Sequence, residues 1–264
     1  MNNNVFILDL DGTIIGDCIY QCEIYKIYLI LSKLGIKIKI NDILERYYNE
    51  KSKLIRPYFK YFITTIKEKI PNSYFYIYTA SEKKWAEKEI KTIEKNLDIK
   101  FNRPIFTRND CKDIIKNDRL FYIKSIENIK KKIKIENPNI IIIDDNDVYR
   151  DNNEKIIICE EYNYKCFCNY WDYIPIDKIR NKIFINYLSK MIEENRLNPI
   201  YIKHSTKQQM EYYKWLYNKC EEINKKNKKY REDKFWLNLT KIIIENKKEN
   251  NDISLNQIKK RMNN

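Results

Sequence analysis

A short apolar run that breaks into two aspartates and a glycine constrains this chain more than any other feature. The run extends from Val5 to Leu8, and Asp9, Asp11 and Gly12 follow it. Such a run is typical of a strand buried in a parallel sheet. Glycine permits a sharp turn out of the strand. The pattern therefore places two carboxylates at the carboxyl end of a strand, where open α/β sheets bind their ligands.

Two further apolar runs also end in polar residues. The run 74–78 is rich in β-prone aromatics and ends at Thr79, and the run 140–143 is four isoleucines ending at Asp144 and Asp145. In a parallel sheet the carboxyl ends of neighbouring strands meet at one edge, so these side chains are expected to converge with Asp9. Clustered carboxylates repel one another unless a cation is present, and oxygen ligands favour Mg²⁺. The sequence therefore predicts an α/β fold with a magnesium site at this edge.

A helix is predicted directly after the second run. From Glu82 onward the composition is helical, with Trp85, Ile90, Ile93 and Leu97 on roughly helical spacing. Ser81 is interpreted as the N-terminal cap of this helix. The hydroxyl and free backbone N–H groups at Thr79 suit a phosphate oxygen.

The motifs together resemble the haloacid dehalogenase (HAD) superfamily of phosphoryl-transfer enzymes. The similarity is greatest to the branch that contains the RNA polymerase II C-terminal domain (CTD) phosphatases and their NLI-interacting-factor-like relatives. It extends from about Val5 to about Ile176 and rests on the order in which several short motifs follow one another. These motifs are the run that ends at Asp9, then Arg56-Pro57, Thr79-Ala80-Ser81, Arg108, Cys111, Tyr122-Ile123-Lys124, Asp144-Asp145 and Trp171-Asp172. The resemblance implies a Rossmann-like parallel sheet of HAD type.

The resemblance also implies catalytic roles. Asp9 is expected to be the nucleophile that forms an aspartyl-phosphate. Asp11 is expected to protonate the leaving oxygen and then to activate water. Thr79 is expected to hydrogen-bond the phosphoryl oxygens, and Lys124 to neutralise charge on the phosphoryl group and the aspartates.

The same resemblance implies binding residues. Mg²⁺ is expected to be held by Asp9, the backbone carbonyl of Asp11 and Asp145, with Asp144 as a supporting acid near the metal and Lys124. Substrate contacts are expected from three further residues: Gly12, Thr13 and Ala80.

The implied function is Mg²⁺-dependent hydrolysis of phosphomonoesters, and the implied substrate is phosphoserine or phosphothreonine on a protein. Three departures bear on that substrate: Gly12 stands where the closest relatives have glutamate, Ser125 stands where they have aspartate, and residues 18–53 read as helical where the family often has strands. Two alternatives therefore stay open. One is a phosphatase of nucleotides or polynucleotide ends, and the other is a catalytically weak module that binds protein or nucleic acid.

The chain divides by composition into a HAD-like catalytic domain, 1–176, with a helical insert at 18–53, and a basic helical region, 177–264. Residues 177–264 carry 21 lysines and arginines against 11 aspartates and glutamates, so they hold +10 of the net charge of +14. Helices are predicted at 177–195, 210–223 and 234–245, and a short fourth follows a Ser254–Gln257 capping box. The lysine-rich segment 225–229 is interpreted as a basic linker.

Two interpretations of the basic region remain. It is either a helical addition packed on the catalytic domain with solvated charges, or a binding module for an anionic partner such as nucleic acid. No apolar run approaches the ~20 residues that span a bilayer, no secretion signal is visible, and seven cysteines at irregular positions suit reduced thiols. The chain is therefore expected to be intracellular, in the cytoplasm or nucleus, and to have no membrane partner.

Overall fold

The computed structural model of the chain describes residues 3–16, 54–116, 119–149, 155–164, 220–250 and 253–262. The predicted insert at 18–53, the Trp171-Asp172 motif, the predicted domain boundary at residue 176 and the helices predicted upstream of Cys220 lie outside these residues. No helix within the described ranges is long and apolar enough to cross a bilayer.

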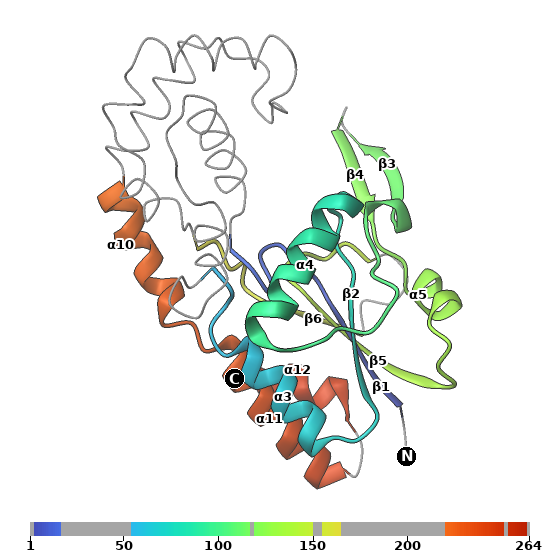
Figure 1. Cartoon of the computed structure of the whole chain (residues 1–264). Coiled ribbons are helices and arrows are strands. Elements are labelled where there is room, and N and C mark those ends of the chain that lie inside the picture. The colour runs from blue at the N-terminus through green and yellow to red at the C-terminus, as the bar shows by residue number, and fades with distance from the viewer. Residues whose placement is uncertain are drawn as a thin grey trace, which may run out of the picture.

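A parallel four-stranded sheet forms the centre of the described structure (Figure 1). Its strands are β1 (Asn3–Leu8), β2 (Ser73–Ile77), β5 (Pro138–Asp144) and β6 (Ile156–Ile158), in the order β2-β1-β5-β6. Leu8 pairs with Ile77 on one side and with Ile143 on the other. This register confirms the predicted parallel sheet. It also places the residues that follow β1, β2 and β5 side by side.

The side chains of β1 alternate between two cores, as the period of a strand requires. Phe6 and Leu8 enter one core together with helices α3 (Phe59–Lys69) and α4 (Lys83–Leu97). Val5 and Ile7 enter the other core, which includes α5 (Ile126–Lys132). Burial on both faces explains why β1 and β5 read as continuous apolar runs rather than as alternating patterns.

A short antiparallel hairpin precedes Lys124. After the 3-10 turn η1 (Arg108–Asp110) the chain forms β3 (Lys112–Lys116) and β4 (Arg119–Ile123). Figure 1 shows this hairpin projecting from the body of the molecule at the end opposite to α3, α11 and α12. Lys124 follows β4 directly, and its backbone N–H donates to the carbonyl of Val148, 2.9 Å away.

The described C-terminal helices contribute side chains to the core that contains α3 and α4. They are α10 (Cys220–Arg231), α11 (Phe235–Asn250) and α12 (Leu255–Met262). α11 packs against α3, and the fully buried ring of Trp236 lies 4.6 Å from that of Phe62 and 5.1 Å from that of Phe59. Arg56 also forms a two-bond ion pair with Asp233. This part of the basic region therefore fits the first interpretation, a helical addition packed on the domain.

The prediction of a basic linker at 225–229 is wrong, because these residues lie inside α10. Lysine is a good helix former, and no glycine or proline interrupts the segment. The spacing of its lysines could not distinguish a solvated helix face from a linker.

Candidate active site

The central feature of the site is a buried lysine between two buried aspartates. Lys124 Nζ donates to Asp9 Oδ1 over 2.6 Å and to Asp144 Oδ2 over 2.7 Å. All three side chains are less than one-tenth exposed. Asp9 follows β1, Asp144 ends β5 and Lys124 follows β4, so three separate segments deliver the charges to the predicted edge of the sheet.

Burial and pairing set the charge state of this group. Burial raises the pKa of Asp9 to about 6, against the opposing effect of Lys124 and with a contribution from Asp11. Burial likewise raises the pKa of Asp144 to about 6, again opposed by Lys124. Burial alone would lower the pKa of Lys124, but the two carboxylates raise it well above its ordinary value. The lysine is therefore a fixed cation.

Asp11 faces the hydroxyl groups of Thr79 and Ser81, which follow β2. Ser81 Oγ donates to Asp11 Oδ2 over 2.8 Å, and Thr79 Oγ1 lies 3.4 Å from the same oxygen. Burial raises the pKa of Asp11, while the hydrogen bond from Ser81 lowers it. A carboxyl group with a raised pKa and a fixed orientation suits proton donation.

The predicted role of Ser81 as a helix cap is wrong. The N-cap of α4 is Glu82, with no side-chain hydrogen bond to the helix. The hydroxyl of Ser81 is used by Asp11 instead. The sequence could not reveal this, because Asp11 is 70 residues away in the chain.

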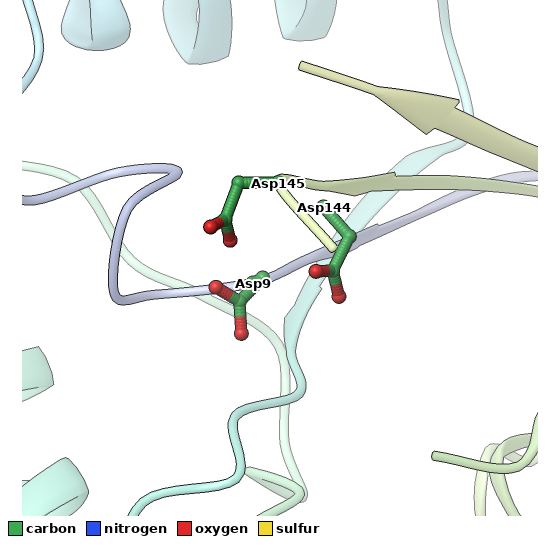
Figure 2. Close-up of side chains that lie close together, drawn as sticks. All are labelled: Asp9, Asp144 and Asp145. Carbon is green, nitrogen blue, oxygen red and sulfur yellow. The ribbon is translucent and has the colours of Figure 1, made fainter. Parts of the chain in front are cut away.

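Three carboxylates form a candidate metal centre. Asp9, Asp144 and Asp145 each offer an oxygen, and these oxygens lie within 4.8 Å of one another (Figure 2). Gly12 adopts a left-handed φ of 77°, and a Cβ at this position would lie 2.7 Å from Asp145 Oδ2. The turn at Gly12 thus leaves room for the Asp145 carboxylate. An all-oxygen donor set of this kind fits a hard divalent cation.

The residues predicted to contact substrate have different surroundings. Thr13 is fully buried and its hydroxyl donates to Asp145 Oδ1 over 3.3 Å, so in this structure it orients a carboxylate. The carbonyl of Ala80 accepts a hydrogen bond from Arg108 Nε over 2.8 Å. Gly12 acts through its backbone conformation, beside Asp145.

Sequence reasoning gave no role to several residues around these groups. Arg108 was part of the family pattern only; its guanidinium lies 4.6 Å from the ring of Tyr122 and forms an ion pair with Glu82. Tyr78 and Tyr149 flank the ammonium of Lys124. Their positions depend on how distant segments pack, for which a single sequence carries no signal.

Glu89 is a further residue that the helical pattern did not identify. It lies on the buried face of α4, and no residue in the described part of the chain forms a hydrogen bond with its Oε2. Burial first, and then the negative charge of Asp11, raise its pKa from 4.5 to about 8. At neutral pH this carboxyl group is therefore protonated in the folded protein and ionised in the unfolded chain.

Glu89→Gln is expected to raise the free energy of unfolding above that of the wild type by an amount that grows as the pH rises. Because the folded pKa of Glu89 exceeds the unfolded one, the wild type loses stability between pH 4.5 and about pH 8. The slope is at most ~1.4 kcal/mol per pH unit. Urea unfolding at pH 5 and pH 7 should show the variant gaining about 2–2.5 kcal/mol over the wild type across this interval. A difference that does not change with pH would contradict a neutral buried Glu89.

Comparisons with known proteins identify the family. A family model described as NLI interacting factor-like phosphatase matches residues 4–170. No curated protein matches the chain.

Two solved structures of the RNA polymerase II CTD phosphatase Fcp1 are similar to the chain, one of them the fission yeast protein bound to beryllium fluoride. They share 18% and 15% sequence identity with it, with TM-scores of 0.43 and 0.40. Each match covers 99% of this chain and 70% of the solved chain.

The family match includes β1, β2 and β5 and every residue of the candidate site. It also extends over well over half of the sequence. The chain therefore belongs to the NLI interacting factor-like phosphatase family.

Proposed function

We propose that this phosphatase hydrolyses phosphomonoesters with Mg²⁺ through a phosphoryl group carried on Asp9. The observation that carries the proposal is the pairing of the Asp9 carboxylate with the buried Lys124, while Asp11 stands two residues away with separate hydrogen bonds. Environments that differ in this way separate the roles of two carboxyl groups.

The first half-reaction is a displacement at phosphorus. Asp9 Oδ1 accepts from Lys124, and among the described residues no donor occupies Oδ2, which is the oxygen we assign to attack. The bond from Oδ2 to phosphorus forms as the bond from phosphorus to the leaving oxygen breaks. Asp11 gives its proton to that oxygen, and Lys124 balances the negative charge on the phosphoryl oxygens.

The second half-reaction reverses the use of Asp11. The Asp11 carboxylate accepts a proton from water, and the water oxygen attacks phosphorus. The bond from phosphorus to Asp9 breaks at the same time. The products are inorganic phosphate, a free Asp9 carboxylate and a protonated Asp11. Ser81 and Thr79 keep one oxygen of Asp11 fixed, so the other oxygen faces the leaving group and the water.

The Mg²⁺ ion would be held by Asp9, Asp145 and the backbone carbonyl of Asp11, while Asp144 holds Lys124 in place. When bound, the ion supplies positive charge that offsets the charges of the aspartates and of the phosphate. Thr13 and the turn at Gly12 orient Asp145 toward that position.

We infer a phosphorylated serine or threonine of a protein as the substrate, on the strength of the family. The net charge of +14 and the lysines of α10 favour one alternative, a phosphorylated nucleic-acid end. Binding of nucleic acid by residues 177–264 stays a prediction.

The full-length protein incubated with Mg²⁺ and a phosphoserine peptide is expected to release phosphate, and EDTA is expected to stop the reaction. A 3′-phosphorylated oligonucleotide assayed in parallel distinguishes the two substrate classes. Faster turnover of the oligonucleotide would overturn the assignment of a protein substrate. Absence of hydrolysis of either substrate, and of p-nitrophenyl phosphate, would overturn the proposed reaction and favour an interaction protein.

A further inference from the structure

The ammonium of Lys124 has aromatic as well as carboxylate neighbours. Its Nζ lies 5.7 Å from the ring centroid of Tyr78 and 5.8 Å from that of Tyr149. The two rings meet edge to face at 89°, with centroids 6.0 Å apart. Lys124 and Tyr149 also face each other in an isolated parallel bridge. Two aromatic rings and two carboxylates thus border a single buried cation.

The two tyrosines differ in what their hydroxyl groups do. The Tyr78 hydroxyl donates to the carbonyl of Asp110 over 2.6 Å and accepts from the backbone N–H of Ser125. The Tyr149 hydroxyl is buried, and among the residues that the structure describes it has no hydrogen-bond partner. Within the described structure, the contact of Tyr149 with the site is therefore that of its ring with Lys124.

The ring faces can hold the ammonium without using up its donors. Lysine has three N–H donors, and Asp9 and Asp144 accept two of them. An aromatic face attracts a cation within about 6 Å of its centroid, most strongly where water is excluded. The tyrosines therefore restrain the ammonium while one N–H remains for an oxygen of the substrate.

We propose that Tyr78 and Tyr149 form an aromatic cage that positions the Lys124 ammonium for transfer of the phosphoryl group, with Tyr149 acting through its ring alone. This assignment rests on the proposed function. Neither tyrosine contacts a reacting atom in the proposal, so both are positioning residues. The cage makes a specific physical prediction, namely that turnover depends on the electron density of the ring at position 149.

The test is a fluorination series at position 149. Tyr149→Phe, which keeps the ring and removes the hydroxyl, serves as the reference, and the ring is then substituted with one, two and three fluorines. Fluorine weakens the attraction of the ring for a cation with little change of shape. The kcat for p-nitrophenyl phosphate at saturating Mg²⁺ is expected to fall at each step, by roughly tenfold over the series, with KM changing less than about twofold.

The matched control is the same fluorination at Phe106. This ring is fully buried and lies 5.3 Å from that of Tyr78, in the same core as Tyr149, but among the described cation–π contacts none joins it to Lys124. A merely structural effect of fluorine would appear equally at both positions, and would overturn the cage. A kcat that does not change with fluorination at position 149, in an active enzyme, would also overturn the cage. Absence of turnover in the wild type would instead overturn the proposed function, and the cage with it.

Discussion

Asp9→Asn is expected to lower the kcat for a phosphoserine peptide by about four orders of magnitude or more, the scale of loss seen when a covalent nucleophile is removed. An amide oxygen is a poor nucleophile, so the bond to phosphorus does not form. The substitution also removes the negative charge opposite Lys124, which lies 2.6 Å away. Two contributions, nucleophilicity and the pairing that fixes Lys124, are thus lost together.

The Asp9→Asn protein is expected to stay folded. Burial already raises the pKa of Asp9 to about 6, so a neutral side chain at this position avoids the cost of burying a charge, and Lys124 keeps Asp144 as its partner. Asp113→Asn, on the exposed hairpin, is the matched control and is expected to retain wild-type turnover. Phosphate release by the folded Asp9→Asn variant at the wild-type rate would contradict the assignment of the nucleophile.

Trp236→Ala is expected to lower the free energy of unfolding by about 3–5 kcal/mol. The indole is fully buried between α11 and α3 and packs against Phe59, Phe62 and Phe235. Its removal leaves a cavity in a core that also contains Phe6 and Leu8 of the strand that delivers Asp9. Helix α11 is therefore expected to stabilise the core that also supports β1.

Urea unfolding at one pH measures this effect. Phe121→Ala is the control, because Phe121 is 44% exposed on the hairpin and its removal should cost less than about 1 kcal/mol. A similarly small loss for Trp236→Ala would contradict the packing of α11 as part of the core.

The elements that bear the site could be predicted because their signals are local. The runs before Asp9 and Asp144 are strands buried on both faces, and such strands appear in a sequence as continuous apolar runs. Because the strands are parallel, their carboxyl ends lie at the same edge of the sheet. Helix α11 was likewise predicted, at 234–245 against the observed Phe235–Asn250.

Side-chain partners across the fold could not be predicted in this way. Lys124 resembles any other lysine of a lysine-rich chain, so its place beside the two aspartates was expected from the family resemblance and not from the residues alone. Ser81 fits the composition of a helix cap but bonds to Asp11. Gln257, assigned to a capping box with Ser254, bonds instead to Asn246 and Asn250. For Ser81 the partner is 70 residues away in the chain, and reasoning from the sequence considers only the local partner.

The most direct test of the central claim is to trap the phosphoryl group on the protein. Full-length protein is mixed with Mg²⁺ and a phosphopeptide, quenched in acid during turnover and digested, and the peptides are analysed by mass spectrometry. The mechanism predicts one added phosphoryl group on the peptide that contains Asp9, and none in the Asp9→Asn variant. A phosphoryl group on another residue, or turnover with no labelled peptide at any quench time, would contradict it.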